Sequence, residues 1–427
     1  MIDAARTPAS LPVALNSTYL IRVRFLAPFF GLVLVAACNR GSEKTLTIAV
    51  NAGVEGTALK AAAKEWGEAR GVRVEVVELP YSNLFEKEQL DLTSRTGAYD
   101  VIMLDDPWFA RLVQGSSLAP LAREPDADFV SSCLDVCRNP YRTGTYFALP
   151  YVGNSQLFFY RADLFAKYGL APPKTWSEVL AAARKIGSGE KMYGYVMRAA
   201  PGNAVVTDFM PLLWAFGADV LDLSGKPACD SPAAIESLRF MLELGKYSPP
   251  GYAGFNSDEV SAHLLQSTAA MSINWPAWIR AMDDPSKSRV VGKIDFIPMP
   301  GERVPGVGEL GTWLLAVPSA SKRTAEAFEF VYWVTDPAQM KQAALRGNPP
   351  TRRSVFQSPE LTSRFRAFPA QLASLESARP RPRSPLWNEI ENAFGIYLSK
   401  ANAGAMGPDE AMRQAAREIG QIVERPR

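Results

Sequence analysis

Two neighbouring carboxylates and an indole follow one of the apolar segments of the chain. The run Asp105-Asp106-Pro107-Trp108 comes directly after the β-prone segment 99–104. Carboxylate oxygens accept hydrogen bonds and an indole presents a broad apolar face, so this group could bind a hydroxyl-rich ring. A hydrolase could instead use Asp105 or Glu55 as an acid or base, but adjacent residues rarely approach one reacting centre from opposite sides. The structural alternative is that Asp106 caps the next helix and Trp108 lies in the core.

The elements around this group predict how it is positioned. Segments 45–50, 72–79 and 99–104 are rich in β-branched residues, and amphipathic helices are expected at 58–69 and 81–94 between them. This β-α-β-α-β order predicts a parallel sheet with helices on its faces. Ligands of such sheets bind beyond the carboxyl ends of the strands. The loop 51–57, which contains Glu55, is therefore expected near Asp105.

The stretch 148–178 reads as a crossover between two halves of the molecule. An extended entry at 148–151, with Tyr151, is followed by a turn at Gly153-Asn154 and an apolar strand at 156–160. A short helix at 163–168 follows, and Thr175 and Glu178 have the spacing of a capping box. A buried strand entered through an extended segment is typical of a hinge between lobes.

Further candidate contacts lie later in the chain, where aromatic residues, amides, glycine or arginine stand at predicted strand tips or turns. A strand is expected at 193–197 and a helix at 209–216, which carries Trp214. The candidates are Trp214, Asn274, Trp275, Gly311, Trp313 and Arg352. Trp214 could equally be a core residue.

Composition excludes several classes of function. The chain has 427 residues, with 46 Lys and Arg against 44 Asp and Glu, so charge gives no indication of nucleic-acid binding. A single histidine, His263, argues against a histidine metal site and weakens any serine- or cysteine-nucleophile mechanism. We therefore predict no metal site, no cofactor and no catalytic residue. The cysteines Cys133, Cys137 and Cys229 are read as buried thiols or, for the first two, a bridge.

The N-terminus has the features of a bacterial lipoprotein leader. Arg22 and Arg24 precede the uncharged apolar run 25–37, which is too short to span a bilayer. The run ends in Val35-Ala36-Ala37-Cys38, the pattern of an aliphatic residue, two small residues and a cysteine. We therefore predict a leader and tether over 1–43 and lipidation of Cys38.

Several motifs in this order resemble the extracellular solute-binding proteins of ABC transporters. They are Ala148-Leu149-Pro150, the strand ending at Tyr160, Pro172-Pro173-Lys174-Thr175-Trp176, Ala269-Ala270-Met271 and Pro350-Thr351-Arg352. The chain is most similar to the carbohydrate-binding family 1, which includes maltose-, trehalose- and glycerol-phosphate-binding proteins. The resemblance implies an α/β, two-lobed periplasmic-binding-protein fold of type II, with three hinge crossovers. The implied lobes are 44–148 with 276–335, and 149–275 with 336–427.

The resulting prediction is binding without catalysis. The protein would be the lipid-anchored, monomeric binding component of an ABC importer in the bacterial cell envelope. It would take a di- or oligosaccharide between the lobes and deliver it to permease subunits served by a separate ATPase. A carbohydrate hydrolase and a sugar-sensing receptor subunit remain alternatives, and polyamine or metal cargo is not excluded. The predicted ligand contacts are Glu55, Asp105, Asp106, Trp108, Tyr151, Asn154, Trp214, Asn274, Trp275, Gly311, Trp313 and Arg352.

Overall fold

A five-stranded sheet organises the first part of the protein. In the computed structural model, which describes residues 45–425, its strand order is β2-β1-β3-β10-β6. The strands are β1 (Thr45–Asn51), β2 (Arg73–Leu79), β3 (Val101–Asp105), β6 (Ala148–Val152) and β10 (Trp313–Ala316). β1 is parallel to β2 and β3, as the β-α-β-α-β pattern predicts, whereas β10 is antiparallel to both β3 and β6.

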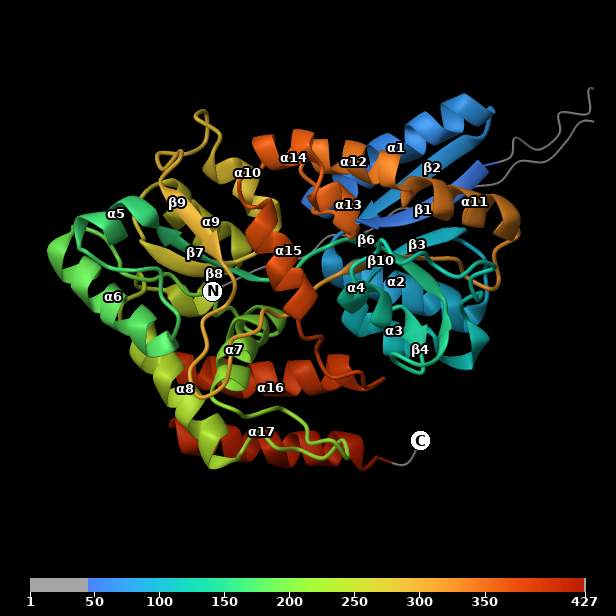
Figure 1. Cartoon of the computed structure of the whole chain (residues 1–427). Coiled ribbons are helices and arrows are strands. Elements are labelled where there is room, and N and C mark those ends of the chain that lie inside the picture. The colour runs from blue at the N-terminus through green and yellow to red at the C-terminus, as the bar shows by residue number, and fades with distance from the viewer. Residues whose placement is uncertain (1–44, 426–427) are drawn as a thin grey trace, which may run out of the picture. The chain divides into compact units, whose positions relative to one another are not determined.

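Helices pack on both faces of this sheet. Figure 1 shows α1 and α11 on one side of it and α2 and α3 on the other. The helices near this sheet are α1 (Val54–Arg70), α2 (Tyr81–Ser94), α3 (Asp106–Leu112), α4 (Ser131–Asp135), α11 (Thr324–Val334), α12 (Pro337–Leu345), α13 (Arg353–Phe356), α14 (Pro359–Arg364) and α15 (Phe368–Ser377). A short hairpin of β4 (Arg138–Asn139) and β5 (Thr145–Tyr146) lies apart from the sheet. The observed α1 and α2 contain the helices expected at 58–69 and 81–94.

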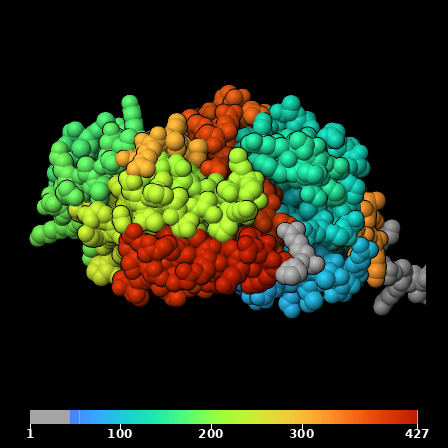
Figure 2. Space-filling model, turned by 90° about the horizontal axis from the view of Figure 1, so that it is seen from below, coloured from blue at the N-terminus to red at the C-terminus, as the bar shows by residue number. Residues whose placement is uncertain are grey.

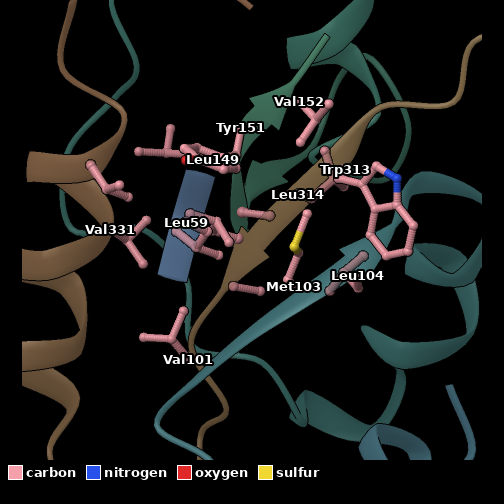
Figure 3. Packing of buried hydrophobic residues seen from close by; sticks show 14 of the residues in the cluster. Leu59, Val101, Met103, Leu104, Leu149, Tyr151, Val152, Trp313, Leu314 and Val331 are labelled. Carbon is pink, nitrogen blue, oxygen red and sulfur yellow. The ribbon is translucent and has the colours of Figure 1, made fainter. Parts of the chain in front are cut away.

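The core of this part is built from side chains of both helices and strands. Figure 3 shows Leu59 of α1 and Val331 of α11 beside Met103, Leu104 and Leu314 of the sheet. All five side chains are fully buried. Their burial supplies the apolar stabilisation that holds the ends of β3 and β10 in place.

A second, three-stranded sheet has the order β8-β7-β9. Its strands are β7 (Leu157–Arg161), β8 (Met271–Asn274) and β9 (Ile294–Ile297), and β7 is antiparallel to both neighbours. The implied boundaries assign residues 276–335 to the first lobe, whereas β9 pairs with β7. Hydrogen bonds such as that from Ala162 N to Lys293 O, at 2.8 Å, extend this attachment beyond the strand.

Helices cover the second sheet and pack with it into hydrophobic clusters that are separate from the first core. They are α5 (Ala162–Lys167), α6 (Trp176–Gly189), α7 (Asn203–Ala215), α8 (Pro232–Gly245), α9 (Ser257–Leu265), α10 (Ile279–Met282), α16 (Trp387–Asn402) and α17 (Pro408–Val423). The capping box of Thr175 and Glu178 is present at the start of α6, as predicted. Figure 2 shows the C-terminal helices beside the segment near residues 200–230 on one face; α16 packs directly against α7 and α17.

The segment 193–197 is not the strand that its sequence indicates. It makes one bridge, from Tyr193 to Ala269, and Val196 N donates to Met271 O. Its other N–H groups reach different partners, such as the carbonyl of Tyr247 that accepts from Tyr195 N. A Cβ on Gly194 would lie 2.0 Å from the carbonyl oxygen of Ala183, so the chain runs directly against α6. Backbone packing against a helix therefore replaces a regular ladder.

The three cysteines of the described region are buried free thiols. Cys137 Sγ donates to the carbonyl of Cys133 at 3.3 Å, and burial raises the pKa of Cys133 to about 12. Of the two readings that the sequence allowed, the structure has thiols. Cys38 lies outside the described residues. None of the helices between residues 45 and 425 is both long and apolar enough to cross a membrane.

The core argument predicts a large effect of truncating Leu314. Leu314→Ala should lower the free energy of unfolding by about 2–5 kcal/mol, because it leaves a cavity between the sheet and its helices. Urea denaturation followed by circular dichroism measures this. The matched control is Leu223→Ala, since Leu223 is fully exposed and its truncation should change stability little. Equal effects of the two variants would contradict this account of the core.

Candidate functional site

A cavity of about 730 Å³ lies where the two sheets meet α7, α9 and α16. This volume is in the range of pockets that bind small molecules. Its wall is polar on many sides, with acidic, amide, guanidinium and aromatic groups. Among its lining residues are Asn51, Glu55, Tyr81, Phe85, Asp105, Trp108, Asn154, Arg198, Asn203, Asn256, Ser257, Trp275, Gly311, Trp313, Arg381, Asn388 and Glu391.

Strand direction explains why these distant residues meet. Asp105 ends β3 and is paired with Trp313, the first residue of the antiparallel β10. Trp313 is also paired with Val152 at the end of β6. The carboxyl ends of β3 and β6 and the amino end of β10 therefore share one edge of the sheet. Gly311 N donates to Asn154 O at 3.0 Å, which brings the chain after β6 to the same place.

Strand pairing in the second sheet likewise brings Trp275 to the cavity. Asn274 ends β8 and is paired with Leu157, the first residue of β7. The end of β8 therefore lies next to the segment that follows Asn154. Trp275 is the next residue and lines the cavity.

Aromatic rings of two kinds face or support the cavity. Tyr81 and Trp275 are partly exposed, whereas Trp108 and Trp313 are 1% and 5% exposed. The ring centroids of Trp108 lie 4.6 Å from Tyr81, 5.2 Å from Phe85 and 5.7 Å from Trp313. Tyr81 and Trp275 thus offer ring faces to a bound molecule, while the two buried indoles hold Tyr81 in place.

Trp275 lies directly over the backbone of Gly311. A Cβ on Gly311 would stand 2.8 Å from two carbons of the indole, closer than side-chain atoms approach one another. Glycine at this position therefore permits the ring to lie close against the chain. The guanidinium carbon of Arg198 lies 5.7 Å from the centroid of the Trp275 ring on the cavity wall.

A buried guanidinium gathers three carboxylates at the floor of the cavity. Arg381 forms ion pairs with Asp105 at 3.2 Å, Glu309 at 3.3 Å and Glu391 at 3.6 Å. Tyr81 Oη also donates to Asp105 at 2.8 Å, and Asn203 Nδ2 donates to Glu391 at 2.9 Å. These contacts connect the end of β3, the segment before β10 and helix α16.

Burial governs the protonation of these groups. Burial lowers the pKa of Arg381, but the charges of Asp105 and Glu309 outweigh it and raise that pKa well above its ordinary value. Burial raises the pKa of Glu309 well above its usual range despite Arg381, and it also raises the pKa of Glu391. Burial likewise raises the pKa of Glu55. Burial thus disfavours the charged forms of these acids, and the charge of Arg381 opposes this effect at Glu309 and Glu391.

A second arginine lies at the wall formed by α7 and α9. Arg198 Nε donates to Asp208 Oδ1 at 3.2 Å, and its Nη1 donates to Ser257 Oγ at 3.1 Å. The backbone N–H of Arg198 donates to the other oxygen of Asp208 at 3.0 Å. Burial raises the pKa of Asp208 to about 6, and Arg198 opposes this shift. The pair fixes the guanidinium beside α7.

Seven of the predicted contact residues line the cavity. They are Glu55, Asp105, Trp108, Asn154, Trp275, Gly311 and Trp313. The expectation that ligands bind beyond the carboxyl ends of the strands thus pointed to two loops, 51–57 and 105–108, that both reach this cavity. Their contact with a ligand remains a prediction, and Trp108 is buried enough to act as support for Tyr81.

The other five predicted residues do not line the cavity. Asp106 is fully buried, accepts from Thr312 N at 3.1 Å and pairs with Arg383 at 2.9 Å, and burial raises its pKa to about 7. Asn274 donates to Ser261 Oγ at 3.0 Å and accepts from Trp275 N. Tyr151 is fully buried in the first core.

Trp214 and Arg352 complete this group. Trp214 lies in a different hollow, where the guanidinium of Arg379 stands 4.8 Å from its ring. Arg352 is 4% exposed and pairs with Asp126 and Asp128 while its Nε donates to Thr335 O at 2.7 Å. Its guanidinium thus holds loops together, so the motif that suggested a sugar contact has a structural use.

Sequence reasoning did not select Arg198, Asn203, Arg381 and Glu391. Asn203 precedes a helical segment, and Arg381 lies in the run Arg379-Pro380-Arg381-Pro382, which gives no indication of burial. Glu391 is one of the buried residues of α16, beside Ile390. A charged residue among apolar positions of α16 is the one local signal that could have indicated it.

The arrangement has the chemistry of a binding site. Asp105 is engaged by Arg381 and Tyr81, and within residues 45–425 no cluster of three or more His, Cys, Asp or Glu side chains is suited to hold a metal ion. Ring faces, carboxylates and amides around a polar cavity can hold a neutral polyhydroxylated molecule through stacking and paired hydrogen bonds.

Comparison with known proteins agrees with this geometry. The model of a family described as bacterial extracellular solute-binding protein matches residues 52–341. A probable amino-acid ABC transporter periplasmic-binding protein from Sinorhizobium fredii is 29% identical over 379 residues, which cover 86% of this chain and 85% of that protein.

Solved structures with the same architecture include sugar and polyol complexes. An ABC transporter solute-binding protein from Agrobacterium radiobacter in complex with ribitol has a TM-score of 0.81 and 28% identity, covering 88% of this chain and 98% of that one. A maltose-bound protein of T. maritima has a TM-score of 0.80 and 27% identity, covering 88% and 98%. The fold is thus the two-lobed, maltose-binding-protein-like type II fold, as predicted. With a family model matched over most of its length, the chain belongs to the bacterial extracellular solute-binding proteins.

Proposed function

We propose that this protein is the substrate-binding component of an ABC importer and that it binds a sugar or polyol in the 730 Å³ cavity. The carrying observation is that two partly exposed aromatic rings and several hydrogen-bonding groups line the same cavity. Tyr81 and Trp275 offer apolar faces, while Asp105, Glu55 and Asn154 offer acceptors or donors beside them. Pyranose rings and polyol chains present both kinds of surface, since apolar C–H groups alternate with hydroxyls.

The relatives support the same class of ligand. Two of the similar structures contain ribitol and maltose, so the ligands of these relatives range in size from a pentitol to a disaccharide. The cavity is large enough for either ligand. A larger ligand, such as the di- or oligosaccharide that the sequence analysis predicts, would fill more of it. The Sinorhizobium relative is named for amino acids. An aliphatic amino acid would leave the two rings of the cavity without a stacking partner.

The mechanism would be closure of the two lobes on the ligand. We assign the five-stranded sheet to one lobe and the three-stranded sheet to the other, within the predicted boundaries except that β9 goes with β7. A ligand that contacts Asp105 from one lobe and Trp275 from the other would stabilise the closed arrangement, because it binds that arrangement more tightly. The closed form would then dock on the permease subunits, which are served by a separate ATPase.

The first test is a binding titration. Adding ribitol, mannitol, maltose or a longer maltodextrin should change the tryptophan fluorescence saturably, because Trp275 lines the cavity and Trp108 and Trp313 pack behind it. Dilution should reverse the change, and chromatography should recover the sugar unaltered. Cleaved product would favour the hydrolase alternative. Binding without any loss of uptake in a deletion strain would favour the receptor alternative.

Stacking predicts a specific role for Trp275. Trp275→Leu should weaken binding of the best sugar about tenfold, which corresponds to about 1.4 kcal/mol. Gly311→Ala should weaken it in the same direction, since the new Cβ would displace the indole. Calorimetric titration measures both. Trp333→Leu, on α11 and away from the cavity, is the matched control and should bind as the unaltered protein does. Equal losses in the control would show a general effect on folding.

Anchoring is a separate proposal that rests on the lipobox ending at Cys38. Cys38→Ala should abolish incorporation of radiolabelled palmitate and should shift the protein from the membrane fraction to the soluble fraction. Binding of sugar by the purified protein should not change, because the residues that line the cavity lie between Asn51 and Asn392. Label retained by the variant would refute lipidation at this cysteine.

A further inference from the structure

The wall of the cavity carries more acidic than basic side chains. In the described part of the chain, four acids and two arginines line it, namely Glu55, Glu86, Asp105 and Glu391, with Arg198 and Arg381. Each arginine also has a buried acidic partner that does not line the cavity. Arg198 pairs with Asp208 at 3.2 Å, and Arg381 pairs with Glu309 at 3.3 Å. The formal charge of these groups taken together is therefore strongly negative.

Glu55 has no basic partner within residues 45–425. Its carboxylate accepts from Nδ2 of Asn51 at 3.4 Å, and the charge that acts on it is the negative charge of Asp105. Glu55 lies in the first turn of α1, where the positive end of the helix dipole favours a carboxylate. Burial and the charge of Asp105 raise the pKa of Glu55, while its own backbone N–H and the Asn51 amide oppose this shift. A cation beside Glu55 would stabilise its charged form.

Asp105 supplies an independent second observation. It occupies the N-cap of α3, where an aspartate ordinarily accepts from a helix N–H, but its side chain makes no such bond. Its Oδ2 instead accepts from Tyr81 Oη at 2.8 Å and from Arg381 Nη2 at 3.2 Å. Its Oδ1 has no donor in the described structure, and it is not among the unpaired atoms that are fully enclosed. Asp105 is 5% exposed and lines the cavity, so this free oxygen can accept from a ligand there.

Adjacent strands bring Glu55 and Asp105 to one place. β1 ends at Asn51, the hydrogen-bond partner of Glu55, and it runs parallel to β3, which ends at Asp105. Tyr81 donates to Asp105, is partly exposed and lines the same cavity. The face of an aromatic ring attracts a cation. Two carboxylates and an aromatic ring thus form one group at the edge of the first sheet.

Taken together, these features point to a positively charged group on the ligand. We infer that Glu55, Asp105 and Tyr81 form an ammonium-binding subsite, and that the ligand is an amino sugar or an amino polyol. This inference rests on the proposed carbohydrate-binding function and deepens it. An ammonium group donates several hydrogen bonds and needs no donor in return, whereas a hydroxyl donates a single one. Its charge also offsets the acids of the wall, which a neutral sugar leaves uncompensated.

The remaining wall indicates that the charged group belongs to a carbohydrate. Amide side chains also line the cavity, and an amide can donate to one hydroxyl oxygen and accept from another. They are Asn51, Asn154, Asn203, Asn256, Asn388 and Asn392. Trp275 is partly exposed and offers an aromatic surface on which a sugar ring can stack. A simple diamine has no hydroxyl groups for these amides, so it should bind more weakly than an amino sugar.

The test compares matched charged and neutral ligands on the full-length protein by calorimetric titration at about pH 7. The pairs are glucosamine with glucose, glucamine with glucitol, and the glucosamine disaccharide with cellobiose. N-acetylglucosamine keeps the sugar ring but has an uncharged amide, and putrescine has charge without hydroxyl groups. We expect each amine to bind about tenfold more tightly than its neutral partner, N-acetylglucosamine or putrescine, because hydrogen bonds between charged groups are the stronger ones.

Two variants test where the ammonium group binds. Glu55→Gln keeps the shape of the side chain and an acceptor for Asn51 but removes the charge, so affinity for glucosamine should fall about tenfold more than affinity for glucose. Glu68→Gln is the matched control, because Glu68 lies on the same helix, its side chain is 70% exposed and it does not line the cavity. The control should leave the preference for amines unchanged.

The outcomes separate this inference from the proposed function. Neutral sugars that bind as tightly as their amines, or a preference for amines that survives Glu55→Gln, would overturn the ammonium subsite and leave the proposed function standing. Putrescine that binds more tightly than every carbohydrate, or absence of binding by every carbohydrate, would overturn both. The comparison of ligands on the unaltered protein does not depend on the folding of either variant.

Discussion

The ion pairs of Arg381 are the interaction on which the site depends most. One guanidinium contacts Asp105 at the end of β3, Glu309 before β10 and Glu391 on α16, all of them buried. Removing one partner from such a group leaves a buried charge uncompensated, which is far more costly than the net contribution of the intact group. The cluster therefore favours one relative arrangement of these three segments, and the cavity is built upon it.

The direction of β10 is the second constraint. Because it runs antiparallel between β3 and β6, its first residues reach the edge where the other two strands end. Gly311 and Trp313 thus enter the cavity from a segment about two hundred residues beyond Asp105. The rings, carboxylates and amides of the wall come from five or more separate stretches, and this edge of the first sheet supplies Asp105, Gly311 and Trp313.

The sequence predicts well the alternating strands and helices of the first sheet and the loops that follow β1 and β3. The β-branched run at 45–50 reflects burial in a parallel sheet, and the carboxyl-end rule then places Glu55 and Asp105 together. It predicts less well the role of a residue whose partners lie far away along the chain. Arg352 looks like a ligand contact until its partners Asp126 and Asp128 are seen, and Arg381 looks like a loop residue until three carboxylates surround it. Segment 193–197 has the composition of a strand, but its packing against α6 follows from Gly194, whose role depends on a distant helix.

The place of β10 within the sheet also has a consequence for biogenesis. The neighbours of β3 on that side, β10 and then β6, cannot assemble until residues 313–316 have been synthesised, although β6 itself ends at residue 152. Contacts of such long sequence separation slow folding. An early segment of the nascent polypeptide is thus left with an unpaired strand edge until part of the last third of the chain has been synthesised.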